Sequence, residues 1–99
     1  RWGQRWQTVA TLLEDLGCLS RRCVAVEVGV FQGETSGHLL RRLPLLRLHG
    51  VDPYGGFVDM PNADGSVYQV ARKLFASFGQ RAFLHRNVSR DVVAKVVRL

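Results

Sequence analysis

Two carboxylates and two glycines form the part of the sequence best suited to hold a ligand. Glu27 lies near the end of a short apolar run, and Gly29 and Gly33 follow it. Because glycine has no Cβ, a turn built on these residues lets backbone amides approach a ligand closely. Asp52 follows a second apolar run, where a carboxylate can accept hydrogen bonds from a ribose diol. This pattern predicts the first half of a mononucleotide-binding unit.

Each of these residues also has a purely structural explanation. Glu27 at the end of a buried strand either faces the ligand crevice or caps a nearby backbone amide, and we favour the first. Thr35 and Ser36 begin a helix, where their amides can bind an anionic group or their hydroxyls can cap the helix. Asp52 precedes Pro53, and an Asp-Pro pair often starts a turn.

Alternating strand and helix patterns surround these residues. The hydrophobic spacing and the breaking residues predict helices over 4–16, 34–43, from 64 or 66 to 78, and from 89 onward, with strands over 23–28, 46–51 and 81–86. The first strand is apolar on both faces, which suits a buried parallel strand. Residues 53–65 form a long irregular stretch, which we interpret either as a lid or as a variable connection.

The cysteines and histidines give no further site. Cys18 and Cys23 are not spaced as CxxC, and two cysteines do not make a disulfide framework, so both are expected to be free thiols. His38, His49 and His85 fall on different predicted elements, without the spacing of metal ligands, so no metal site is expected.

The composition places the chain among single globular domains. Its 99 residues carry a formal net charge of +6, but the arginines are dispersed, which argues against a dedicated nucleic-acid site. No apolar run approaches the ~18 residues of a membrane span. The N-terminus has neither an initiator Met nor a signal h-region, so we expect a cytoplasmic protein whose sequence begins inside a longer chain.

The segment EVGVFQG at residues 27–33 resembles the first motif of class I S-adenosylmethionine-dependent methyltransferases. The following ETS at 34–36 and the VDPY at 51–54 are similar to small-molecule methyltransferases of the methyltransferase-24 type. The resemblance implies an α/β, Rossmann-like three-layer sandwich with parallel strands in the order 3-2-1 and flanking helices. Residues 1–99 would cover its first three βα units and lack the C-terminal half.

The resemblance also implies a binding site for S-adenosylmethionine. Gly29 and Gly33 would line the turn beneath the methionine part, Glu27 would hold that end, and Asp52 would bind the ribose. Tyr54 would lie near the adenine. The full set of cofactor-binding residues implied in this way is Glu27, Gly29, Gly33, Thr35, Ser36, Asp52, Tyr54, Val88 and Ser89.

The second half of such an enzyme, which normally supplies the substrate-binding and catalytic residues, does not match any part of this sequence. We therefore name no catalytic residue and expect the fragment alone to be inactive. The first strand, residues 23–28, would be central in the complete fold but becomes an apolar edge here. We expect either that the chain is a fragment of a larger product or that it self-associates through this edge.

The sequence thus predicts the cofactor-binding half of a methyltransferase that acts on a small molecule. One alternative is a non-catalytic basic α/β module that binds RNA or a protein partner, as the net charge and the missing half suggest. The other is a nicotinamide-dinucleotide-binding domain. The spacing between Gly29 and Gly33 argues against this last reading, because pyrophosphate binding requires GxGxxG.

Overall fold

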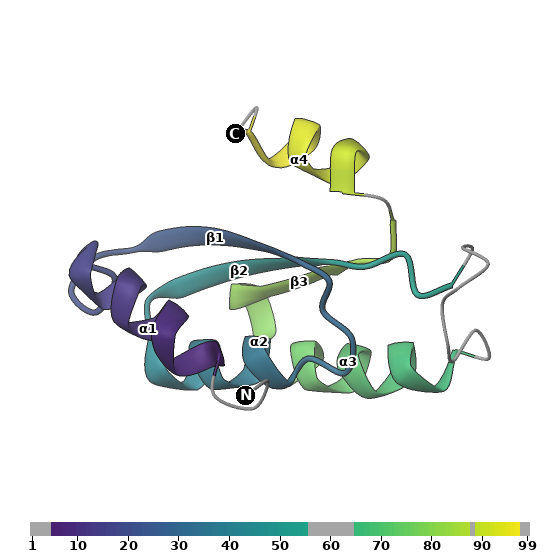
Figure 1. The fold of residues 1–99 in the computed structure, drawn as a ribbon, viewed down its shortest axis with the longest axis horizontal. Coiled ribbons are helices and arrows are strands. Elements are labelled where there is room, and N and C mark those ends of the chain that lie inside the picture. Colours follow the sequence, from purple (N-terminus) through teal and green to yellow (C-terminus); the bar gives the residue numbers. More distant parts are fainter. Residues whose placement is uncertain (1–4, 56–64, 88, 98–99) are drawn as a thin grey trace.

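The computed structural model describes residues 5–55, 65–87 and 89–97 (Figure 1). Along the chain the elements are α1 (Arg5–Asp15), β1 (Cys23–Val28), α2 (Glu34–Arg42), β2 (Leu46–Val51), α3 (Ser66–Ala76), a short 3-10 turn η2 (Gly79–Arg81), β3 (Ala82–His85) and α4 (Ser89–Val97). Every predicted helix and strand is confirmed, with ends that differ by a few residues at most. Most of the irregular stretch that we interpret as a lid or as a variable connection, namely residues 56–64, lies outside the described residues.

The three strands form one parallel sheet in the order β1-β2-β3. The register pairs Cys23 with Leu46 and Val28 with Val51, so β1 and β2 match along their whole length. Figure 1 shows α1, α2 and α3 beneath one face of the sheet and α4 above the other. The chain is therefore a small α/β fold in which β2 is central and β1 forms one edge.

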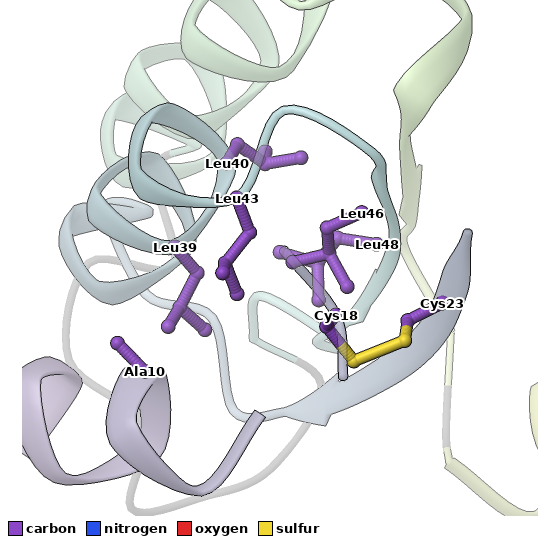
Figure 2. Packing of buried hydrophobic residues seen from close by; sticks show 8 residues of the cluster. All are labelled: Ala10, Cys18, Cys23, Leu39, Leu40, Leu43, Leu46 and Leu48. Atoms are coloured by element: carbon purple, nitrogen blue, oxygen red, sulfur yellow. A yellow bond between two sulfur atoms is a disulfide. The ribbon is translucent and has the colours of Figure 1, made fainter. Parts of the chain in front are cut away.

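A cluster of leucines joins α2 to the sheet (Figure 2). Leu39 and Leu40 of α2, and Leu43 just after it, pack in one cluster with Leu46 and Leu48 of β2, and all five are buried. Full burial of such a side chain contributes ~1.5–3 kcal/mol, so this cluster makes a large contribution to stability. A second cluster, under the turn that follows β1, consists of Val30, Tyr54, Val67, Ala71 and Phe75.

Gly50 lets α3 approach the sheet closely. A Cβ at this position would lie 2.7 Å from Phe75 Cζ and 2.7 Å from Val30 Cγ2. Both neighbours belong to the second core cluster, and neither could yield that much space without repacking. Glycine is therefore required by packing near the C-terminal end of β2, although it is a poor strand former.

Arg81 closes the C-terminal end of α2. Its guanidinium donates hydrogen bonds to the carbonyl oxygens of Leu40, Leu43 and Leu46 at 3.0–3.2 Å. The last carbonyls of a helix have no partner within the helix, and here the side chain of Arg81, the last residue of η2, provides one. This contact fixes α2, the loop after it and β3 relative to one another.

The prediction that both cysteines are free thiols is wrong. Cys18 and Cys23 form a disulfide, with their Cα atoms 5.5 Å apart. Gly17, two residues after α1, has φ 90°, and the turn around it folds back so that Cys18 faces the first residue of β1. Both cysteines pack in the leucine cluster (Figure 2), so the disulfide fastens the end of α1 to the sheet.

Candidate functional site

The turn between β1 and α2 depends on two left-handed glycines. Gly29 has φ 85° and donates its N–H to the carbonyl of Val51 at 2.9 Å, which continues the pairing of β1 with β2. Gly33 has φ 88° and is the N-cap residue of α2. No side chain caps this helix, so the hydroxyls of Thr35 and Ser36 do not play the capping role considered for them.

Asp52 fastens this turn to the end of β2. Its Oδ2 accepts a hydrogen bond from the Phe31 N–H, and its Oδ1 accepts one from the Tyr54 N–H, both at 2.9 Å. The carboxylate is only 5% exposed. The second bond is the side-chain-to-backbone contact that an Asp makes when it starts a turn. In this structure Asp52 therefore makes the contacts of a residue that starts a turn, which is the structural alternative given for it above.

Phe31 and Tyr54 have unusual backbone conformations. They are the two non-glycine residues with positive φ in the described part of the chain, at 55° and 51°. Such conformations cost ~1–3 kcal/mol each and persist where neighbouring contacts enforce them. The Asp52 carboxylate holds both amides, and the Tyr54 hydroxyl donates to the Phe31 carbonyl at 2.6 Å. The three residues therefore form a closed loop of hydrogen bonds.

Glu27 lies beside this loop and accepts a hydrogen bond from the Ser36 hydroxyl. Burial raises the pKa of Glu27 above its ordinary value, although the bond from Ser36 and the charge of Arg5 act in the opposite direction. Burial, followed by the Asp52 and Glu27 charges, raises the pKa of Tyr54. The Glu27 carboxylate therefore lies in the electrostatic field of both the Tyr54 hydroxyl and the Arg5 guanidinium.

A groove of about 740 Å³ opens between α1, β1 and the glycine turn. Its polar lining includes Glu27 and Thr35, and its apolar lining includes Val9, Leu13 and Ala25. Trp6 of α1 also lines it and stacks on His38 of α2, with ring centroids 4.4 Å apart. Sequence reasoning did not assign α1 to the site. The one signal was the tryptophan in an otherwise aliphatic stripe.

The structure divides the predicted cofactor-binding residues into groups. Glu27, Gly29 and Thr35 line the groove. A second group lies behind them and is buried, namely Gly33, Ser36, Asp52 and Tyr54. Ser89 begins α4, on the other face of the sheet from α1–α3 (Figure 1), and Val88 lies outside the described residues.

No protein-family model, curated protein or solved structure matches the chain. Across the described ranges, no group of three or more His, Cys, Asp or Glu side chains is arranged to hold a metal ion. None of the described helices is long and apolar enough to cross a membrane. Any assignment of function therefore depends on the geometry of the glycine turn and its groove.

Proposed function

We propose that this chain is the cofactor-binding half of a class I S-adenosylmethionine-dependent methyltransferase that acts on a small molecule. One observation carries the proposal. A left-handed glycine turn joins β1 to α2 and is fastened by Asp52 to the end of β2, while Glu27 and Thr35 line the groove that it borders. The strand order 3-2-1, with a further strand beside β1, belongs to this proposal.

The groove suits the methionine end of the cofactor. That end carries an ammonium group, and Glu27 offers a carboxylate oxygen besides the one bonded to Ser36. A bound cation would lower the pKa of Glu27 and keep it ionised. Gly29 has no side chain to fill the space above the turn, and a Cβ there would meet no atom within 4 Å. Bound S-adenosylmethionine would supply an electrophilic methyl group.

The ribose fits less directly. Each oxygen of Asp52 accepts one backbone hydrogen bond and keeps a second lone pair, so the carboxylate can accept ribose hydroxyls as well. However, the carboxylate is buried beneath Phe31 and Tyr54. We therefore propose that nucleoside binding displaces Phe31, which is exposed and lines the groove.

The cytoplasmic location remains a prediction, and the disulfide between Cys18 and Cys23 argues against it. Disulfides persist mainly in oxidising compartments and are rare in the cytosol.

The two alternative functions also remain open to test. They are binding of a nicotinamide dinucleotide, and binding of RNA or a protein partner by a non-catalytic module.

Amide NMR spectra recorded with S-adenosylhomocysteine, NAD and a short RNA separate these functions. The proposal predicts that S-adenosylhomocysteine shifts the amide signals of Gly29 to Gly33, and that the other two ligands leave them in place. Shifts caused by NAD alone would favour the dinucleotide-binding domain. Salt-sensitive shifts caused by RNA alone, spread over the arginines, would favour the basic module.

A further inference from the structure

The groove beside the glycine turn is lined by residues of both charges. Glu27 and Glu34 are acidic, and Arg5, the first residue of α1, is basic. Burial raises the pKa of Glu27, while the hydrogen bond from Ser36 and the charge of Arg5 oppose this rise, so the guanidinium lies within electrostatic range of the carboxylate. The groove therefore presents a cation and an anion to the same ligand.

Arg5 reaches the glycine turn because α1 runs back along β1. The disulfide between Cys18 and Cys23 holds the end of α1 near the start of β1. From there the 11 residues of α1 extend for about 16 Å, which is comparable to the ~20 Å of the six-residue strand. Trp6 stacks on His38 of α2, which fixes the first turn of α1. The start of α1 therefore lies toward the carboxyl end of β1 (Figure 1), and Arg5 lines the groove there.

We propose that Arg5 and Glu27 bind the zwitterionic end of an α-amino acid, with Arg5 holding the carboxylate and Glu27 the ammonium group. A planar guanidinium matches a carboxylate through two parallel hydrogen bonds, and Glu27 keeps an oxygen besides the one bonded to Ser36. This inference rests on the proposed function, because the methionine end of S-adenosylmethionine is such a zwitterion. It adds the residue that recognises the carboxylate, and it extends the site to α1.

The rest of the groove suits an apolar side chain on that amino acid. Val9 and Leu13 of α1 line it together with Ala25 of β1. Glu34 lines it as well and would repel a ligand that carries a second carboxylate. The ligand class is therefore an α-amino acid with an apolar or thioether side chain, such as methionine, and not aspartate or glutamate.

A further strand beside β1 would leave this site open. Such a strand would pair with the free edge of β1, whereas ligands of open parallel sheets bind beyond the carboxyl ends of the strands. Glu27 is the last residue but one of β1, and Gly29 follows the strand directly. The zwitterion site is therefore at the end of the strand and not along its edge.

NMR titrations with three probes test the inference on the 99-residue chain. L-Methionine carries both charges, L-methioninamide lacks the carboxylate, and N-acetyl-L-methionine lacks the ammonium group. We expect L-methionine to shift the amide signals of Gly29 and Thr35. It should bind about tenfold or more tightly than either analogue, since each analogue loses a charge-assisted hydrogen bond.

Two variants assign each charge to its residue. Arg5→Gln should weaken L-methionine binding by about tenfold and abolish the preference over the amide, while the preference over the N-acetyl compound remains. Glu27→Gln should show the reverse pattern. Arg72→Gln is the matched control, because Arg72 is exposed on α3 and lies outside the groove. Arg5 is exposed as well, so Arg5→Gln should fold as the wild type does.

S-Adenosylhomocysteine, titrated in parallel, separates this inference from the proposed function. A wild type that binds L-methionine in the expected pattern, but S-adenosylhomocysteine no more tightly, would support the zwitterion site and contradict the methyltransferase. Binding of S-adenosylhomocysteine that Arg5→Gln leaves unchanged would overturn the inference and leave the proposed function standing, since the first amides of α2 would then hold the carboxylate. Equal affinity of the wild type for L-methionine and its amide would overturn it as well. A folded chain that binds none of the probes would overturn both.

Discussion

The side chain of Asp52 accepts a hydrogen bond from the backbone amide of Phe31, 21 residues earlier in the chain, at 2.9 Å. This contact joins the end of β2 to the glycine turn after β1, and it shapes the wall of the candidate site. Since the same carboxylate also holds the Tyr54 amide, it maintains two non-glycine residues in left-handed conformations. Asp52 therefore organises the turn, whatever ligand the groove binds.

Asp52→Ala should lower the free energy of unfolding by about 3 kcal/mol, because the amides of Phe31 and Tyr54 lose a charged acceptor. Asp52→Asn should lose less, since its single carbonyl oxygen can still accept one of the two bonds. Urea unfolding would measure both variants against Asp15→Ala, which removes an exposed carboxylate at the end of α1. Equal stability of Asp52→Ala and Asp15→Ala would contradict this role for Asp52.

Gly50→Ala should destabilise the fold by about 1–3 kcal/mol through overpacking against Phe75 and Val30. The double variant Gly50→Ala/Phe75→Leu should recover part of this loss, because the smaller side chain makes room for the methyl group. Thermal unfolding of the wild type, both single variants and the double variant completes the cycle. Strictly additive effects would show that the two residues do not compete for space.

Reduction of the disulfide between Cys18 and Cys23 should lower the free energy of unfolding by ~2 kcal/mol, a modest value because the closed loop is short. Unfolding with and without a reducing agent measures the effect. The variant Cys18→Ala/Cys23→Ala serves as the control and should not respond to the reducing agent. If the wild type fails to respond as well, the cysteines are not paired in solution.

Acid should destabilise the fold through His49 and His85, whose Nδ1 and Nε2 atoms lie 3.0 Å apart. Burial, His85 and Arg47 lower the pKa of His49, and burial and Lys95 lower the pKa of His85. Below the ordinary value of 6.5 the unfolded chain binds protons that the folded pair resists, so stability falls as the pH decreases.

Glu27 acts in the opposite sense. Because its pKa is raised above 4.5, its contribution to stability decreases as the pH rises through that region.

Comparison of unfolding free energies between about pH 7.5 and pH 5 isolates the histidines if His49→Gln/His85→Gln is included. This variant should lose less stability on acidification than the wild type, while His38→Gln, outside the pair, should behave as the wild type. An unchanged pH profile in the double variant would rule out the pair as the cause.

Sequence periodicity predicted α2 and β2 well because the local signals there agreed with the tertiary structure. The expectation that the first strand is buried on both faces is wrong, since Val24, Val26 and Val28 of β1 are exposed. The stripe of Leu39, Leu40 and Leu43 faces the sheet, and the apolar run of β2 is buried as expected. The disulfide was missed because spacing rules cannot show that the turn after Gly17 folds back on β1. Tertiary contacts decide which loops bring their two ends together, and the pattern of residues along the chain does not show those contacts.

For the candidate site, the sequence predicted which residues take part better than it predicted the contacts that they make. Glu27 and Gly29 line the groove as the pattern suggested, but Asp52 turns inward to the amides of Phe31 and Tyr54. The amides of these two residues, both of which have positive φ, need a hydrogen-bond acceptor, and Asp52 is the nearby acceptor. Residue type alone does not reveal this need. The contribution of α1 to the groove was missed because its apolar stripe also fits a helix packed wholly in the core.

Isothermal titration of the folded chain with S-adenosylhomocysteine, alongside Glu27→Gln and the control Asp15→Asn, tests the proposed cofactor site most directly. The account predicts saturable binding that Asp15→Asn leaves unchanged and that Glu27→Gln weakens by about tenfold or more, because the ammonium group loses a charge-assisted hydrogen bond. Heat changes no larger than dilution for a folded wild type, or equal affinity in Glu27→Gln and the wild type, would contradict a cofactor site at the glycine turn.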